Sequence, residues 1–277
     1  MDMLEKIHAA ANSIEQADAL IVTAGAGMGV DSGLPDFRGV SGFWRAYPMY
    51  ERLGLQFEEA ANPQHFKRDP AFGWGFYGHR LNLYRSTQPH AGFAMLRAWV
   101  DKFQLDLFVV TSNVDGQFQL AGYPDDSIWE IHGSINHLQC VRPCNEKIWE
   151  NHDSIAIDNV EMRADTYPKC PDCGSVARPN ILMFGDWDWL SWRSDEQQQR
   201  FQAFVNRNRE RRVVIIELGA GTALPTIRHL SERLATQLSG RCIRINPREP
   251  EISAPNISLP GGALESLHQI DALLKNS

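Results

Sequence analysis

The chain has 277 residues, 43% of them hydrophobic and 22% charged, a composition typical of a globular protein with one large domain or a domain carrying a smaller insertion. Its formal net charge is −7 and it has no long run of Lys and Arg, so we expect no nucleic-acid partner. Residues 1–16 lack the apolar segment of a signal peptide and the longest apolar runs fall far short of a membrane span, so we expect no membrane partner and a cytoplasmic location.

Helices and strands alternate along most of the chain. The apolar residues of positions 1–16 recur at helical spacing and predict an amphipathic helix. Short apolar runs predict buried strands at 19–23, 105–111, 213–218 and 242–245, with helices at 91–103, 197–208 and 225–238 before the last three. This order predicts an α/β fold with a Rossmann-like, doubly wound parallel sheet, in which ligands bind at the carboxyl ends of the strands.

Two stretches break this alternation. Residues 39–85 are rich in aromatics and Gly and predict a helical insertion, whereas residues 138–177 hold four of the five cysteines and little periodicity. We therefore predict a Rossmann-like domain from residues 1–38, 86–137 and 178–277. The insertion and a metal-binding ribbon would form a small domain.

The cysteines form two pairs. Cys140 and Cys144 are separated by three residues, and Cys170 and Cys173 by two. Two turns that each present two thiolates are typical of a structural zinc site, which leaves no open coordination position for catalysis. The alternative, two redox-active thiol pairs, is less favoured because a redox Cys-x-x-Cys belongs at the start of a helix. Cys242 lies in a predicted strand and is expected to be a buried bystander.

A glycine turn directly follows the first predicted strand. Gly25 and Gly27 permit close approach of the backbone to a phosphate, but the sixth position of the dinucleotide fingerprint is Val30 and no acidic residue ends a strand at the expected distance. An ordinary hydride-transferring dehydrogenase is therefore disfavoured.

Further motifs resemble those of one family in the same order along the chain. They are the segment from Gly25-Ala26-Gly27 to Gly33-Leu34-Pro35-Asp36-Phe37-Arg38-Gly39, then Thr111-x-Asn113-Val114-Asp115, His132-Gly133, the two cysteine pairs, Arg178-Pro179-x-Ile181-Leu182-x-Phe184-Gly185-Asp186, Gly221-Thr222 and Ile245-Asn246. This set resembles the sirtuins, the Sir2-like NAD-dependent protein deacylases of bacterial type. The resemblance implies that the Rossmann-like domain binds NAD as co-substrate and that the cysteines hold one structural zinc ion.

The resemblance also implies the reaction. An acyl-lysine carbonyl oxygen of a protein or peptide substrate attacks the nicotinamide ribose of NAD and displaces nicotinamide. Water finally releases the deacylated lysine and O-acyl-ADP-ribose. His132 would be the base on a ribose hydroxyl, a role that suits an imidazole at neutral pH. Asn113 and Asp115 would hold the ribose and the nicotinamide amide. His137 is interpreted as structural.

The remaining NAD contacts follow from the same resemblance. Phe37 would cover the nicotinamide pocket and Arg38 would face the phosphates or a ribose. Gly221 and Thr222 would bind phosphate, and Asn246 the adenosine ribose. The full expected set adds Gly25, Ala26, Gly27, Asp36 and Ser112 and, at a turn before the last helix, Gly262 and Ala263, for which an ordinary loop is an equal alternative.

The acyl pocket carries a further pattern. Tyr77 and Arg80 lie three residues apart, as in sirtuins that remove succinyl or malonyl groups, and residues at this spacing share a helix face. Both could reach one carboxylate. The alternative is a surface helix with an unrelated Tyr and Arg. Ile181, Phe184 and Gly185 would contact the substrate.

Several positions depart from the family pattern. Gly29, Ser112 and Ala223 stand where the pattern has Ser, Gln and Ser, so polar groups expected around NAD are lost or shortened. Trp187, Trp189 and Trp192 follow the Phe184 motif, either as packing residues or as part of an unusual acceptor site. These changes leave open an ADP-ribosyltransferase or an NAD hydrolase that uses the same pocket, and a binding module without turnover. The sequence does not indicate an oligomeric state.

Overall fold

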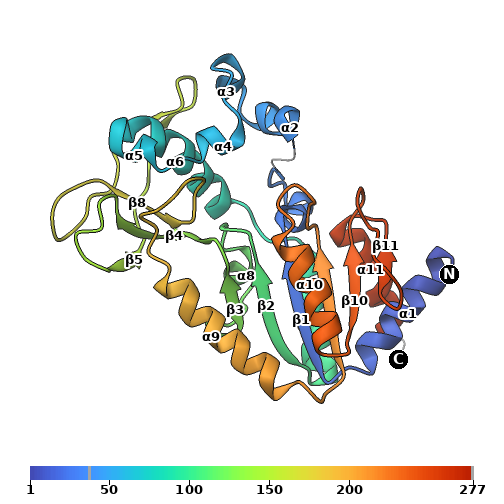
Figure 1. Ribbon diagram of the computed structural model, residues 1–277. Helices are drawn as coiled ribbons and strands as arrows, with labels where there is room; N and C mark the ends of the chain where they lie inside the picture. Colours follow the sequence, from blue (N-terminus) through green and yellow to red (C-terminus); the bar gives the residue numbers. More distant parts are fainter. Residues whose placement is uncertain (37–38, 276–277) are drawn as a thin grey trace.

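The structure is a computed structural model that describes residues 1–36 and 39–275 (Figure 1). One sheet contains six parallel strands in the order β11-β10-β9-β1-β2-β3. The strands are β1 (Ala19–Ala24), β2 (Asp106–Thr111), β3 (Ile128–Glu130), β9 (Val213–Leu218), β10 (Arg241–Ile245) and β11 (Ile257–Leu259). The predicted Rossmann-like parallel sheet is thus confirmed.

Helices cover both faces of this sheet. One face packs against α1 (Met3–Glu15), α7 (Ala91–Phe103) and α11 (Ala263–Leu274), and the other against α9 (Trp192–Arg207) and α10 (Thr226–Gln237). Every residue of β1 and β9 is buried, which explains why these strands are continuous apolar runs in the sequence. No helix within the described ranges is long and apolar enough to cross a membrane.

Short connecting elements surround the sheet. A 3-10 helix, η1 (Ala26–Ser32), follows β1, where a glycine turn leading into a helix was expected. The turn α8 (Gln117–Leu120) and the 3-10 helix η2 (Asp125–Ser127) join β2 to β3. Since β3 and β11 have three residues each, neither had been predicted.

The predicted helical insertion is a cluster of helices beside one end of the sheet (Figure 1). It contains α2 (Gly39–Ala46), α3 (Pro48–Arg52), α4 (Phe57–Ala60), α5 (Gln64–Arg68) and the long α6 (Pro70–Ser86). Their aromatic side chains pack on one another in a second hydrophobic core that contains Phe43, Tyr50, Phe66, Trp74 and Phe76.

A small sheet adjoins this core. It has three antiparallel strands in the order β5-β4-β8, formed by β5 (Ile148–Glu150), β4 (Gly133–Cys140) and β8 (Ala177–Ile181). The strand β4 begins at Gly133, before residue 138 where the sequence placed the start of the ribbon, because one strand runs from the end of the large domain to the first cysteine. A two-stranded hairpin, β6 (Ile157–Asp158) and β7 (Arg163–Ala164), packs against α6.

Candidate functional site

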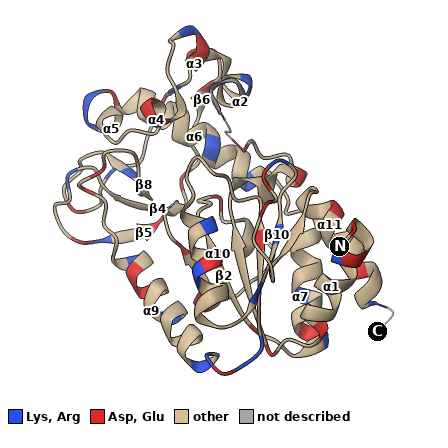
Figure 2. Cartoon of the chain, turned by 45° about the vertical axis from the view of Figure 1, so that its right-hand side comes forward, with Lys and Arg blue, Asp and Glu red and all other residues tan. Residues whose placement is uncertain are grey.

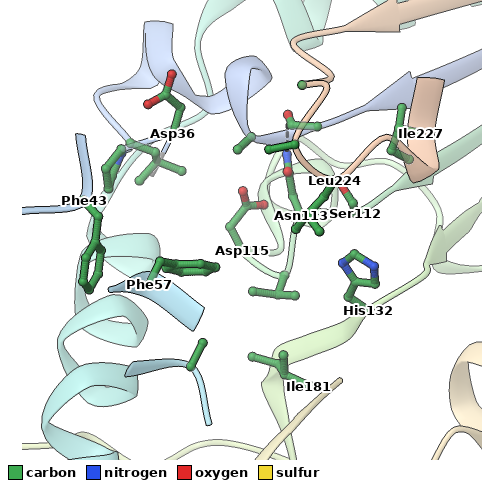
Figure 3. Close-up of a pocket in the computed structure, with 18 of the residues that line it drawn as sticks. Asp36, Phe43, Phe57, Ser112, Asn113, Asp115, His132, Ile181, Leu224 and Ile227 are labelled. Carbon is green, nitrogen blue, oxygen red and sulfur yellow. Dashed lines mark hydrogen bonds between the residues drawn. The ribbon is translucent and has the colours of Figure 1, made fainter. Parts of the chain in front are cut away.

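A cavity of about 650 Å³ lies between the carboxyl ends of β1, β2 and β9 and the helices of the insertion (Figure 3). Its lining combines backbone-rich loops of the large domain with aromatic side chains of the second core. The predicted site residues that line it are Gly25, Ala26, Asp36, Tyr77, Arg80, Ser112, Asn113, Asp115, His132, Ile181, Phe184, Gly221 and Thr222. Phe37 and Arg38 lie outside the described residues.

The glycine turn forms one wall through its backbone. Gly25 donates its N–H to the Leu218 carbonyl and Gly27 donates its N–H to the Gly219 carbonyl, each at a distance of 3.0 Å. The turn after β1 therefore lies directly on the turn after β9. A Cβ atom on Gly27 would lie 2.6 Å from the Cα of Gly219. Gly27 is therefore required by this contact and is not itself among the residues that line the cavity.

The loop after β2 places three polar residues in the cavity, Ser112, Asn113 and Asp115. Asn113 donates from Nδ2 to the Gly25 carbonyl over 3.0 Å, which ties this loop to the glycine turn. Asp115 is buried, and its Oδ1 accepts the N–H of Gln117 over 2.9 Å. Burial, reinforced by the negative charge of Glu130, raises the pKa of Asp115 to about 6.

His132 lines the same cavity as Asp115 and Asn113 (Figure 3). Its backbone carbonyl accepts the N–H of Leu182 over 2.9 Å, which joins it to the strand segment that carries Ile181. Burial lowers the pKa of His132, and a hydrogen bond with the backbone of Ser112 offsets part of this change. If the His132 ring donates one N–H to the Ser112 carbonyl, the second nitrogen of the neutral imidazole is able to accept a proton.

The sheet side of the cavity continues to the turn after β9. Thr222 donates its hydroxyl to Glu249 over 2.5 Å, and both residues line the cavity. Asn246 is fully buried and does not line it: Nδ2 donates to the Ala220 carbonyl over 2.8 Å. Its Oδ1 accepts backbone N–H groups from the following loop. In this structure Asn246 organises two loops, and its expected contact with a ribose stays a prediction.

The turn before the last helix lies farther away. Gly262 caps α11 and Ala263 begins it, and neither lines the cavity. Asp31 of η1 accepts the N–H of Leu264 over 2.8 Å, so this turn is held against the element that follows the glycine turn. The predicted adenine contact stays a prediction.

Aromatic side chains and one buried cation form the opposite wall. Arg80 is 6% exposed, and its Nε donates to the hydroxyl of Tyr84 over 2.9 Å. The guanidinium also lies 5.3 Å from the centre of the Tyr77 ring. Burial raises the pKa of Tyr77 to about 12, so its hydroxyl keeps its proton at neutral pH. Tyr77 and Arg80 thus share one face of α6 inside the cavity, and the alternative of a surface helix is wrong for this segment.

Other lining residues were not predicted. They are mainly apolar or acidic and include Phe43, Phe57, Glu58, Tyr84, Met183, Leu224, Ile227 and Glu249. Tyr84 could have been found, because it follows Arg80 by four residues on the same helix. Gly185, which was predicted, does not line the cavity; it adopts a left-handed conformation with φ of +65° just beyond Phe184.

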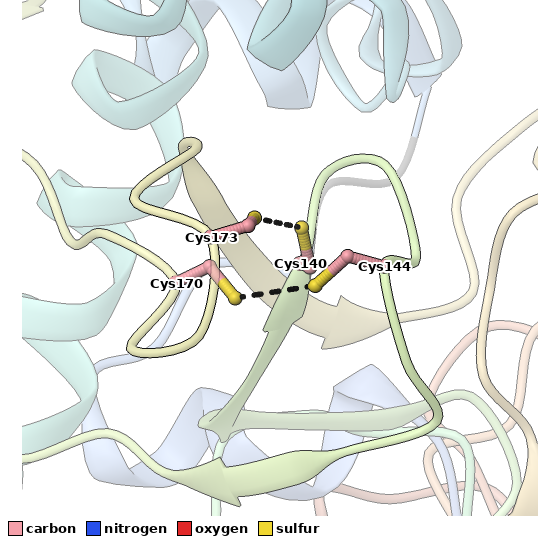
Figure 4. Close-up of side chains that lie close together, drawn as sticks. All are labelled: Cys140, Cys144, Cys170 and Cys173. Atoms are coloured by element: carbon pink, nitrogen blue, oxygen red, sulfur yellow. Dashed lines mark hydrogen bonds between the residues drawn. The ribbon is translucent and has the colours of Figure 1, made fainter.

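The four paired cysteines converge outside this cavity (Figure 4). Their sulfur atoms all lie within 4.8 Å of one another, with Cys140–Cys173 and Cys144–Cys170 at 3.7 Å. Four thiolates at about 2.3 Å from one tetrahedral zinc ion are separated by about 3.8 Å, so the arrangement fits that ion. The sulfur atoms are far beyond the roughly 2.05 Å of a disulfide, which argues against two oxidised pairs. Cys242 is buried in β10, as expected.

Comparisons with known proteins agree with this site. The family model described as the Sir2 family matches residues 25–210. Over 173 residues the chain is 31% identical to the NAD-dependent protein deacylase 1 of Caldanaerobacter subterraneus subsp. tengcongensis, a match that covers 62% of this chain and 63% of that protein. It is 29% identical over 265 residues to the NAD-dependent protein deacylase 1 of Archaeoglobus fulgidus, covering 93% and 94%.

The fold is also similar to solved structures. A mutant Sir2 homologue in complex with 2′-O-acetyl ADP-ribose superposes with a TM-score of 0.72 at 25% identity, covering all of this chain and 97% of that one. The chain spans about 63% of the length of the first sequence relatives that it matches.

Proposed function

Because the chain belongs to the Sir2 family, we propose that it is an NAD-dependent protein-lysine deacylase that releases nicotinamide and O-acyl-ADP-ribose. The observation that carries this proposal is that His132 and Asp115 line the same cavity as the glycine turn and the aromatic wall. NAD would bind along the strand ends, and the acyl-lysine would enter beside Ile181 and Phe184. The expected location stays the cytoplasm.

Each polar residue has a role that its surroundings support. Asp115 would accept the nicotinamide amide N–H₂ in its ionised form. His132 would take a proton from a ribose hydroxyl, since its free ring nitrogen is the acceptor in a neutral imidazole. Asn113 would position the ribose, because its Nδ2 already fixes the side chain against Gly25. The glycine turn and Gly221 would approach the phosphates through the backbone.

We also propose that an acyl group ending in a carboxylate is preferred. The support is the buried wall in which Arg80 and Tyr77 line the same cavity as His132. Although burial lowers the pKa of Arg80, the neighbouring tyrosines raise it above its usual value, so the guanidinium stays charged. A succinyl or malonyl carboxylate could form an ion pair with Arg80 and accept the Tyr77 hydroxyl. An acetyl group would leave these polar atoms without an acyl partner.

The four cysteines would hold one zinc ion. This ion would join the end of β4, which carries Cys140, to the later loop that carries Cys170 and Cys173. With four thiolate ligands it would have no open coordination position for a substrate. The catalytic roles above depend on side chains of the cavity and not on the metal.

Nicotinamide release tests the activity. Native protein and His132→Ala are incubated with NAD, with and without matched acetyl-, malonyl- and succinyl-lysine peptides. We expect release that requires a peptide, fastest with succinyl- or malonyl-lysine, and at least a 100-fold loss of deacylation in His132→Ala. Peptide-independent release would instead indicate NAD hydrolysis, and a modified protein acceptor would indicate ADP-ribosyl transfer.

The acyl preference has its own variants. Tyr77→Phe removes one hydroxyl and Arg80→Met removes the charge while both keep the bulk of the side chain. We expect each to lower kcat/KM for the succinyl peptide by at least tenfold and to change the acetyl reaction by less. A native protein that prefers the acetyl peptide would reject the acidic-acyl preference and leave the deacylase proposal standing.

A further inference from the structure

Trp187 is the most exposed large hydrophobic side chain among the described residues, with 96% of its surface accessible to solvent. Trp is usually largely buried, and an indole that lies wholly in water gains nothing from burial or packing. The other Trp residues that follow Phe184 are less exposed: Trp189 is half-buried, and Trp192 is 42% exposed and donates its Nε1 to the Glu146 carbonyl at 2.7 Å. Trp187 is thus the member of this cluster that presents nearly all of its ring surface to the solvent.

The loop that carries Trp187 is held on both sides of it. Asp186 and Arg178 form an ion pair in which the side chains are 0% and 1% exposed, and Asp186 also accepts the N–H of Asp188 over 3.2 Å. On the other side, the Asp188 carboxylate forms an ion pair with Lys67 at a distance of 2.5 Å. The Asp188 backbone carbonyl accepts a hydrogen bond from the Gln139 side-chain amide, Nε2, at 2.7 Å. Hydrogen bonds and ion pairs therefore fix Asp186 and Asp188, the residues on either side of Trp187, while the Trp187 side chain lies in the solvent.

This loop leaves directly from the cavity wall. Leu182, Met183 and Phe184 line the cavity, and Phe184 donates its N–H to Ala61 over 3.1 Å. Ala61 follows α4, whose acidic residues are red in Figure 2. Glu58 of α4 is exposed and lines the cavity, and within residues 1–36 and 39–275 it forms no ion pair. The Phe184–Ala61 hydrogen bond therefore joins two segments, and each carries an exposed group within three residues of that bond: the indole of Trp187 and the carboxylate of Glu58, which can receive a cation.

We propose that Trp187 is a specificity-determining residue that receives a cationic side chain, that of an arginine, next to the acyl-lysine of the substrate polypeptide. This inference rests on the proposed deacylase function and names the acceptor for it. A guanidinium stacks on an indole through both its charge and its planar face. Glu58 and the net charge of −7 add attraction for a basic segment. The occupant is thus a basic peptide and not an apolar one.

Binding of matched peptides tests the proposal without requiring turnover. Succinyl-lysine peptides that differ at one flanking residue, which is Arg, its neutral isostere citrulline, or Leu, are titrated calorimetrically into native protein, Trp187→Ala, Trp187→Phe and the control Trp192→Ala. We expect the native protein to bind the Arg peptide about fivefold to tenfold more tightly than the other two. Trp187→Ala should reduce this ratio to near one, whereas Trp187→Phe retains part of it and Trp192→Ala all of it.

Turnover separates this inference from the proposed function. Trp187→Ala should raise KM for the Arg peptide severalfold more than KM for the citrulline peptide. A ratio that persists in Trp187→Ala, equal binding of the Leu peptide, or no binding of any peptide to native protein each overturns the inference. Selective binding of the Arg peptide without nicotinamide release would sustain the inference and overturn the deacylase proposal.

Discussion

The two walls of the cavity are built in different ways. On the sheet side, loops after β1 and β9 contact each other through their backbones, and polar side chains such as Asn113 and Asn246 bind neighbouring carbonyls. On the insertion side, aromatic rings surround the Arg80 guanidinium, those of Phe57, Phe76, Tyr77 and Tyr84. One wall is a surface of backbone groups and the other a surface of side chains.

This difference separates two properties of the site. A backbone surface changes little when residues are exchanged, provided that the glycines remain, so it suits a co-substrate that is always the same. A side-chain surface can be altered one residue at a time, so it suits the proposed acyl group and peptide, whose chemistry can differ from one substrate to another. We therefore expect substitutions on the sheet side to affect NAD and stability, and those on the insertion side to affect acceptor choice.

Loss of the zinc site should have the largest effect. Cys170→Ser removes one of four thiolates from a cluster whose sulfur atoms lie within 4.8 Å. Structural zinc contributes roughly 10–16 kcal/mol to small zinc-dependent folds, which is comparable with the roughly 5–15 kcal/mol by which whole domains are usually stable. We expect the ribbon to unfold, the acyl side to be lost with it, and the bound zinc, measured by atomic absorption, to fall from one ion per chain to none.

The fifth cysteine provides the control for that experiment. Cys242 is buried in β10, away from the cluster, so Cys242→Ala should keep the full zinc content. If Cys170→Ser keeps its zinc and its melting temperature, the four-cysteine site is not a structural metal site.

Gly27→Ala should have the next largest effect, on the sheet side alone. The added methyl group would lie 2.6 Å from Gly219 Cα and 2.9 Å from the Gly219 carbonyl oxygen, so one backbone must move. We expect a loss of about 1–3 kcal/mol in the free energy of unfolding and at least a tenfold weaker affinity for NAD, measured by urea denaturation and calorimetry. Binding of acyl peptide should change much less.

Gly29→Ala is the matched control in the same turn. Its methyl group would meet only the Leu34 side chain, at 3.1 Å, and a side chain can shift where a backbone cannot. Equal losses of NAD affinity in the two variants would contradict the view that the contact between the turns after β1 and β9 builds the nucleotide wall.

The sequence predicted the sheet side better than the insertion side, for a physical reason. Strands buried on both faces are short runs of mostly apolar residues, so β1, β2, β9 and β10 were visible even though Glu217 and Arg244 interrupt the last two. The predicted site residues follow directly at the ends of these strands. The strands β3 and β11 have three residues each, which is too short for a periodic signal.

The aromatic wall could not be read in the same way. Phe43 and Phe57 come from two short helices that are separate in the sequence, and only tertiary packing brings them to the cavity. The sequence predicted that Tyr77 and Arg80 lie on one face because they are three residues apart on the same helix, and this spacing is visible without knowledge of the tertiary structure. Asn246 illustrates the opposite problem: its motif marks the right loop, but burial and hydrogen bonds to its neighbours engage its side chain.

Asp115→Asn should have a smaller effect, of opposite sign on stability. The pKa of Asp115 is raised from 3.8 to about 6, so the folded state binds this proton more tightly than the unfolded state. The stabilising contribution is complete below about pH 4 and is lost as the pH rises through 6. Asn lacks the buried charge and keeps an oxygen for the Gln117 N–H, so we expect the variant to be more stable at pH 7.5 by about 1–3 kcal/mol.

Urea unfolding at pH 4.0 and pH 7.5 measures this effect. The stability advantage of Asp115→Asn should nearly vanish at pH 4.0, while nicotinamide release should fall at least tenfold at pH 7.5. A variant that is less stable than native protein at pH 7.5 would show that neighbouring groups stabilise the Asp115 charge, so that the buried carboxylate does not lower the free energy of unfolding.

Lys67→Gln should have the smallest effect, on the acceptor side. It removes the partner of Asp188 in an ion pair whose side chains are 28% and 40% exposed, and pairs this accessible contribute at most about 1 kcal/mol. Asp186 and Gln139 still hold the loop, so Trp187 should keep its place and the preference for an Arg peptide over a citrulline peptide should persist. If peptide titrations show that Lys67→Gln abolishes this preference as Trp187→Ala is expected to do, selectivity on the side-chain wall depends on how the loop is held. If the preference persists in Lys67→Gln and disappears in Trp187→Ala, the indole itself carries the selectivity. A single side chain would then determine acceptor choice, as we expect for a surface that is built from side chains.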